Sequence, residues 1–126
     1  MRKLRIFLLT ALVGMVAATA ATTATWAHAF LDHAVPAVGA NVSGSPSELE
    51  LSFTQNIVPA FSGAEIASAE GGSVPAGKAT FDAANPNVIH LRLGHALKPG
   101  VYVVNWHVVS VDTHRSTGSY KFTVAP

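Results

Sequence analysis

Asp112 and His114 stand two residues apart near the C-terminal end of the chain. Segments rich in Val, Tyr and Phe flank them at residues 101–109 and 118–124, and this composition favours β-strands. A carboxylate and an imidazole in a short connection between two strands can form half of a metal site. The pair also has an ordinary interpretation, because Asp in a loop often caps its own backbone and a nearby His is then incidental. Metal binding here requires further ligands from elsewhere in the chain.

The N-terminal segment supplies a candidate partner. A basic head of three Lys and Arg side chains precedes an apolar run over residues 6–18, and small residues follow as far as Ala27. This layout is typical of a cleaved secretory signal peptide over residues 1–27, since the apolar run is shorter than the ~20 residues of a membrane span. We therefore expect export to the periplasm and a mature chain that begins at His28. A cut one or two residues away, or an uncleaved anchor, is the alternative.

An N-terminal His28 would offer two nitrogen ligands, its α-amine and its imidazole Nδ1. Together with Asp112 and His114, the ligand set becomes one amine, two imidazoles and one carboxylate. Nitrogen and oxygen donors of this kind suit copper(II) well, zinc less well and calcium poorly. The alternative interpretation of His28 is a frayed chain terminus.

The composition after residue 27 narrows the function classes. This part of the chain contains five Lys and Arg side chains and seven Asp and Glu side chains, which gives a formal charge of −2. A basic patch for nucleic acid is therefore not expected. The chain has no Cys, which excludes disulfides, Cys-type zinc sites and blue-copper sites with a Cys ligand. Residues 28–126 have the length of one domain.

Several short segments have the composition or the period-two alternation of half-buried strands. Turn residues such as Pro36, Gly39 and Asn41 separate them. About seven strands in this arrangement predict an all-β antiparallel sandwich or barrel. The aromatic side chains Phe30, Trp106, Tyr120 and Phe122 are expected in its core. The expected strands cover residues 28–31, 48–53, 64–69, 79–81, 88–93, 101–109 and 118–124.

The order of these motifs resembles the CopC family of periplasmic copper-binding proteins. The resemblance covers essentially all of residues 28–126, and it rests on His28-Ala29 after the leader, Leu49-Glu50-Leu51-Ser52-Phe53, Leu97-Lys98-Pro99-Gly100, and Trp106-His107 followed by Asp112-Thr113-His114. It implies a seven-stranded Greek-key β-barrel or sandwich of the cupredoxin or immunoglobulin-like sort. It also implies a copper(II) site formed by His28, Asp112 and His114.

Three departures from the family pattern bear on the metal. Some members carry a Met-rich loop that binds copper(I), but residues 28–126 contain no Met, so we expect no such site. Gln55 stands where the family often has Glu, so this position cannot supply a charge. His107 stands where relatives commonly have Arg, and we interpret it as a solvated side chain rather than an auxiliary ligand. His33, His90 and His95 are interpreted in the same way.

We therefore expect a monomeric periplasmic copper(II) carrier or buffer in copper homeostasis or resistance, without catalysis. The resemblance suggests an inner-membrane copper permease of the CopD type, or a multicopper oxidase, as partner. Two alternatives stay open: a copper oxidase or monooxygenase with a histidine brace, and an accessory β-sandwich that binds no metal.

Overall fold

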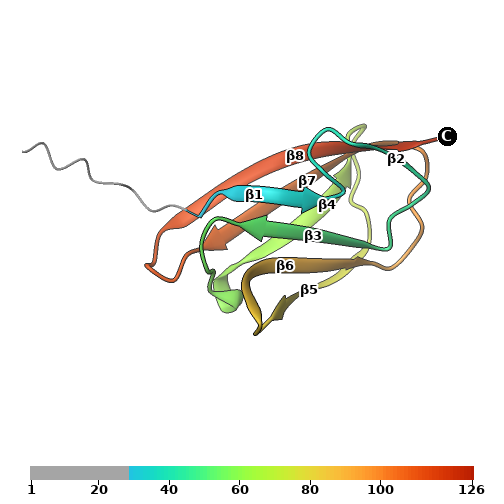
Figure 1. Cartoon of the computed structure of the whole chain (residues 1–126). Coiled ribbons are helices and arrows are strands. Elements are labelled where there is room, and N and C mark those ends of the chain that lie inside the picture. Colours follow the sequence, from blue (N-terminus) through green and yellow to red (C-terminus); the bar gives the residue numbers. More distant parts are fainter. Residues whose placement is uncertain (1–28) are drawn as a thin grey trace, which may run out of the picture.

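A computed structural model describes residues 29–126 and shows two packed β-sheets (Figure 1). One sheet has the strand order β1-β3-β6-β5 and the other has the order β2-β8-β7-β4. A single 3-10 turn, η1 (Pro59–Phe61), precedes β4. The strands are β1 (Leu31–Val35), β2 (Asn41–Ser43), β3 (Glu48–Phe53), β4 (Gly63–Ser68), β5 (Ala76–Asp82), β6 (Asn85–Leu93), β7 (Gly100–Val109) and β8 (Arg115–Ala125).

The core lies between the two sheets and follows the alternation of the sequence. In β3, Leu49, Leu51 and Phe53 face inward, and in β6 the inward residues include Ile89 and Leu91. Opposite them, the second sheet contributes alternate residues of β7 and β8: Val104, Trp106, Val108, Tyr120, Phe122 and Val124. Burial of these apolar side chains is the main favourable term that holds the sheets together.

The predicted all-β fold is confirmed, and of the two predicted forms, sandwich or barrel, the structure shows two packed sheets; the described residues contain no α-helix. The structure divides them into eight strands. The additional strand is β2, which pairs in parallel with the end of β8 from Asn41↔Thr123 to Ser43↔Ala125. Its sequence follows Pro36 and Gly39 and looks like a loop. A short edge strand buries few side chains, so it shows no alternation of apolar and polar residues. No helix within residues 29–126 is long and apolar enough to cross a membrane.

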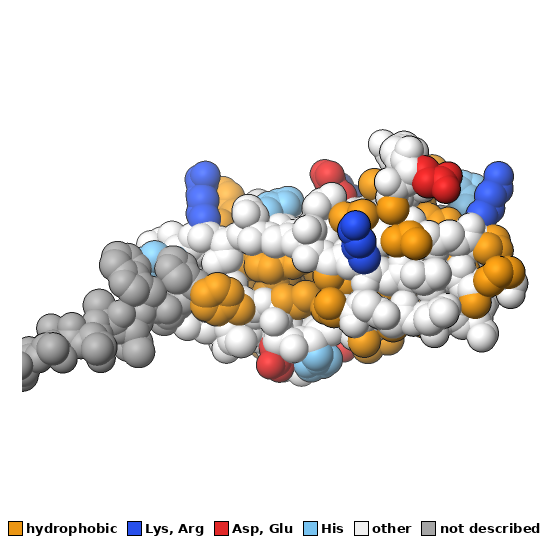
Figure 2. All heavy atoms as spheres, turned by 90° about the horizontal axis from the view of Figure 1, so that it is seen from above, with side chains coloured by type: hydrophobic (Ala, Val, Ile, Leu, Met, Phe, Trp, Pro, Cys, Tyr) orange, Lys and Arg blue, Asp and Glu red, His pale blue; other side chains and the backbone are white. Residues whose placement is uncertain are grey.

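The surface has few charges, and they do not gather by sign on the face seen in Figure 2. Lys and Arg side chains stand apart from one another there, while hydrophobic side chains run along the middle of the face.

The strands β7 and β8 form the longest pair and position the candidate site. They are antiparallel and pair from Gly100↔Val124 to Val109↔Arg115. Their connection, residues 110–114, lies at the same end of the molecule as the beginning of β1 (Figure 1). The predicted signal peptide and His28 lie outside the described residues.

Candidate metal centre

The β7–β8 connection is a tight turn fixed by backbone hydrogen bonds. The Ser110 N–H donates to the His114 carbonyl at 2.9 Å, and the Thr113 N–H donates to the Ser110 carbonyl at 2.8 Å. Thr113 has a φ of 74°, a left-handed conformation that is uncommon for a β-branched residue. Because the turn is closed at both ends, Asp112 and His114 are held on a short, constrained segment between two long strands.

Asp112 and His114 lie beside each other. The Asp112 Oδ1 atom is 3.2 Å from His114 Nδ1, and both side chains are partly exposed. The Ser110 hydroxyl donates a hydrogen bond to the same carboxylate, and the His114 backbone N–H approaches it at 3.4 Å. The Ser110 hydroxyl and then the His114 side chain hold the pKa of Asp112 below its usual range, with burial opposing them only partly. The carboxylate is therefore ionised at neutral pH and already turned toward an imidazole.

Ser110 contacts Asp112, and the sequence did not reveal this contact. It is completely buried, it forms an isolated bridge with Ile57, and its hydroxyl orients Asp112. A Ser two residues before an Asp is a common turn pattern. That spacing could have indicated the contact, although it gives no reason to connect the contact with a metal.

The chain that follows His28 is anchored at this same end. Ala29 is fully buried, the Phe30 N–H donates to Thr54 Oγ1 at 3.0 Å, and the Thr54 N–H donates to the Phe30 carbonyl at 2.9 Å. Two residues beyond Thr54, the Asn56 carbonyl accepts from the Val111 N–H at 3.1 Å. Residues 54–56 thus hold both the residues after His28 and the β7–β8 connection.

The described residues therefore contain two of the three predicted metal ligands, close together. No group of three or more His, Cys, Asp or Glu side chains in residues 29–126 is arranged to hold a metal ion. The donor chemistry fits copper(II) once an N-terminal amine and a second imidazole join Asp112 and His114. The prediction from the sequence assigns those groups to His28, which lies outside the described part of the chain.

The other residues considered from the sequence lie as follows. Gln55 is half-buried in the anchoring segment between Thr54 and Asn56. His107 is exposed on the outer face of β7, and its ring lies over Gly63 rather than with Asp112 and His114. The prediction that Phe30 belongs to the core is wrong, because its side chain is 57% exposed. The neighbouring Ala29 occupies the buried position instead.

Comparisons with known proteins identify the family of the chain. A model of the CopC domain matches residues 31–125. Protein YobA of Escherichia coli strain K12 is 38% identical over 103 residues, which cover 82% of this chain and 83% of that protein. Copper resistance protein C of Xanthomonas campestris pv. juglandis is 37% identical over 118 residues, which cover 89% of this chain and 91% of that protein.

A solved structure extends the likeness to three dimensions. The crystal structure of CopC from Methylosinus trichosporium OB3b superposes with a TM-score of 0.73 at 35% sequence identity, and covers 79% of this chain and 95% of that one. The domain match includes both sheets, the anchoring segment and the Asp112–His114 turn. The chain belongs to the CopC family.

Proposed function

We propose that this protein binds one copper(II) ion in the periplasm and acts as a carrier or buffer, without catalysis. The ligands are the α-amine and imidazole of His28, the carboxylate of Asp112 and the imidazole of His114. The observation that carries the proposal is the Asp112–His114 pair, 3.2 Å apart, beside the segment that anchors Ala29 and Phe30.

The ligand set explains the choice of metal and of role. An amine, two imidazoles and a carboxylate are all nitrogen and oxygen donors, and copper(II) favours a tetragonal set of these. Four protein donors leave little space for a substrate at the metal, which favours carriage over catalysis. The amine and the imidazoles must be deprotonated to bind, so copper affinity is expected to fall as the pH falls.

Calorimetric titration of the exported protein with copper(II) tests the site. We expect one tight equivalent, and a loss of affinity in His28→Ala and in His114→Ala that exceeds the ~10–100-fold typical of losing only an outer-shell partner. His95→Ala is the matched control, because His95 is exposed in the turn between β6 and β7. Equal affinity in all four proteins would remove the proposal.

The position of the N-terminus is tested separately. Mass spectrometry of protein isolated from the periplasm should give a chain that begins at His28. One extra residue before His28 converts the amine into an amide and should weaken copper binding, while the fold remains unchanged by circular dichroism. A protein that binds copper equally well with and without this extension does not use the amine.

The partner and the absence of catalysis are further parts of the proposal. A copper permease of the CopD type in the inner membrane, or a multicopper oxidase, would receive or supply the ion. Transfer of copper from the loaded protein to the purified partner checks this part. Oxidation of chitin or cellulose driven by ascorbate and dependent on His28 would instead favour the monooxygenase alternative.

A further inference from the structure

A second group of imidazoles and carboxylates lies on the outer face of the β1-β3-β6-β5 sheet. A hollow of about 460 Å³ there is lined by His33, Glu50, Asp82 and His90, each from a different strand, together with small and amide side chains. None of these residues belongs to the proposed copper centre. The sequence shows them only as isolated outward positions, and the sheet register brings them together.

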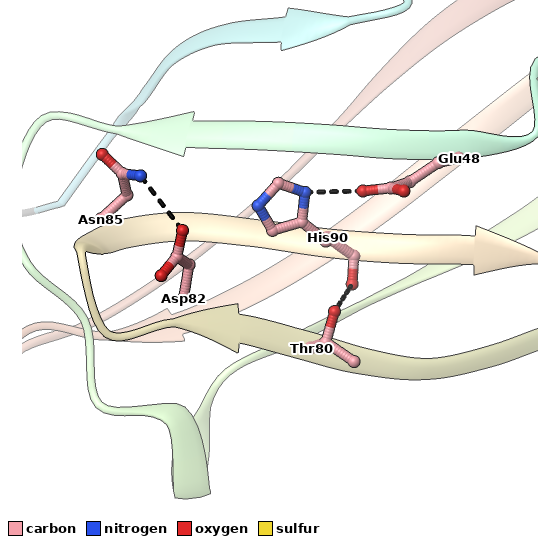
Figure 3. Close-up of polar contacts among 5 residues, drawn as sticks. All are labelled: Glu48, Thr80, Asp82, Asn85 and His90. Carbon is pink, nitrogen blue, oxygen red and sulfur yellow. Dashed lines mark hydrogen bonds and ion pairs between the residues drawn. The ribbon is translucent and has the colours of Figure 1, made fainter.

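His90 is oriented toward the hollow by a neighbouring carboxylate. Its Nδ1 atom lies 2.6 Å from Glu48 Oε1 (Figure 3), and Glu48 itself does not line the hollow. An ionised carboxylate only accepts hydrogen bonds, so Nδ1 carries the proton and a neutral ring offers the lone pair of Nε2. In Figure 3 the second ring nitrogen points away from Glu48, toward the side where Asp82 and Asn85 lie. Histidines that bind metals are commonly held in this way by an outer-shell carboxylate.

Glu50 lies directly beside this imidazole. In the β3–β6 ladder Glu50 is paired with His90, and paired positions of an antiparallel ladder place their Cβ atoms about 4.5–5.5 Å apart. The Glu50 carboxylate makes no hydrogen bond to any residue in the described part of the chain, so it is available as a ligand.

His33 can reach the same hollow from β1. It is paired with Ser52, two residues along β3 from Glu50, which makes it a diagonal neighbour at about 7–8 Å. Its Nδ1 lies 3.3 Å from Asp32 Oδ2, so its Nε2 is again the nitrogen left for a ligand. The side chain is 62% exposed and can turn without disturbing the core.

Asp82 plays a different part. Its two oxygens accept hydrogen bonds from the Ala84 N–H at 2.9 Å and from Asn85 Nδ2 at 3.2 Å (Figure 3). These contacts close the β5–β6 turn, so Asp82 adds negative charge at the rim of the hollow rather than a free ligand.

We propose that this hollow is a second and weaker copper(II) site, formed by His90 Nε2, the Glu50 carboxylate and His33 Nε2. Two imidazoles and a carboxylate suit copper(II) and, less strongly, zinc. No three such groups within residues 29–126 already surround one point, so His33 must swing inward when the ion binds. That movement, and the smaller number of donors, make the affinity lower than at a four-ligand centre.

The test is a copper(II) titration of the exported protein, followed by calorimetry and by electron paramagnetic resonance. We expect a second, weaker equivalent that His90→Gln and Glu50→Gln remove while the tight equivalent stays. His95→Gln is the matched control and should keep both. Glu48→Gln should weaken the second equivalent by about 10–100-fold, the usual effect of losing an outer-shell partner.

Nuclear magnetic resonance on the unsubstituted protein gives a readout that does not depend on a variant folding. Once one equivalent of copper(II) has filled the tight site, a further fraction of an equivalent should broaden amide signals of residues around His33, Glu50 and His90. Absence of a second equivalent, its survival in His90→Gln, or its equal loss in His95→Gln would overturn the proposal. An extension before His28 should weaken the tight equivalent alone, so the two sites can be tested independently.

Discussion

Gly118 lies under the indole of Trp106, and a side chain at this position should destabilise the fold. The two residues are paired in the β7–β8 ladder; Trp106 belongs to the core, and Gly118 is half-buried. A Cβ atom at position 118 would lie 2.4 Å from Trp106 Cζ2 and 2.7 Å from its Cε2. Trp106 is buried and its ring meets Phe53 edge to face, with centroids 5.1 Å apart. A Gly118→Ala methyl group therefore requires the indole or the backbone beside it to shift.

The expected cost follows from overpacking. Inserting atoms into a well-packed core typically costs about 1–3 kcal/mol. In a domain of this size each kcal/mol lowers the melting temperature by roughly 4–8 °C. Urea unfolding of the exported protein, followed by Trp fluorescence, should show a reduced free energy of unfolding for Gly118→Ala, with an unchanged denaturant slope.

Two controls separate the contact from a general effect of replacing Gly. Gly94→Ala has no atom within 4 Å of the new Cβ and should stay within about 0.5 kcal/mol of the unsubstituted protein. In the Trp106→Phe background the smaller ring leaves space, so Gly118→Ala should cost less there. A Gly118→Ala protein as stable as the unsubstituted one, or an equal cost in both backgrounds, would refute the reasoning.

Three further substitutions follow from the same structure. Gly63→Ala places a Cβ 3.0 Å from His107 Cε1, but His107 is an exposed side chain that can move away. Urea unfolding should therefore show a loss in the free energy of unfolding below about 1 kcal/mol. The Tyr120 hydroxyl is buried without a hydrogen-bond partner in the described chain, and burial raises its pKa. Because an unsatisfied buried hydroxyl costs free energy, Tyr120→Phe should raise the melting temperature, and a lower melting temperature would contradict this. The hydrogen bond from the Ala84 N–H lowers the pKa of Asp82 in the folded protein below its ordinary value of 3.8. The ionised carboxylate therefore stabilises the fold above pH 3.8, and this stabilisation is lost as the pH falls through the lower pKa of the folded protein. Asp82→Asn should thus be less stable at pH 7, with a difference that shrinks below about pH 4 in urea titrations; a difference independent of pH would count against this.

The sequence predicted those parts of the fold that follow from local alternation. The expected strand at residues 48–53 coincides with β3, and the expected strands at 88–93 and 101–109 fall inside β6 and β7, because each has one face buried in the core. It did not predict β2, whose only ladder partner is the end of β8. Parallel pairing between segments about eighty residues apart leaves no signal in the spacing of either one.

The position of Phe30 shows a second limit. An aromatic residue near the start of a strand is expected to be buried, but alternation does not fix which face it takes where the ladder is irregular. The β1–β3 register shifts between Leu31 and His33, and Ala29 rather than Phe30 faces the core. A shift of one residue reverses the faces of all neighbours.

For the candidate metal centre too, some features could be predicted from the sequence and others could not. Asp112 and His114 could be placed together from sequence, because a turn between two paired strands keeps residues two apart close in space. Ser110 and residues 54–56 could not, since their roles depend on hydrogen bonds across the fold: the Ser110 hydroxyl to Asp112, the Phe30 N–H to Thr54, and the Val111 N–H to Asn56. These contacts fix where the segment around Phe30 approaches the β7–β8 connection. The predicted ligands are therefore readable as residue types, whereas the contacts that orient and anchor them come from Ser110 and residues 54–56, which are not predicted ligands themselves.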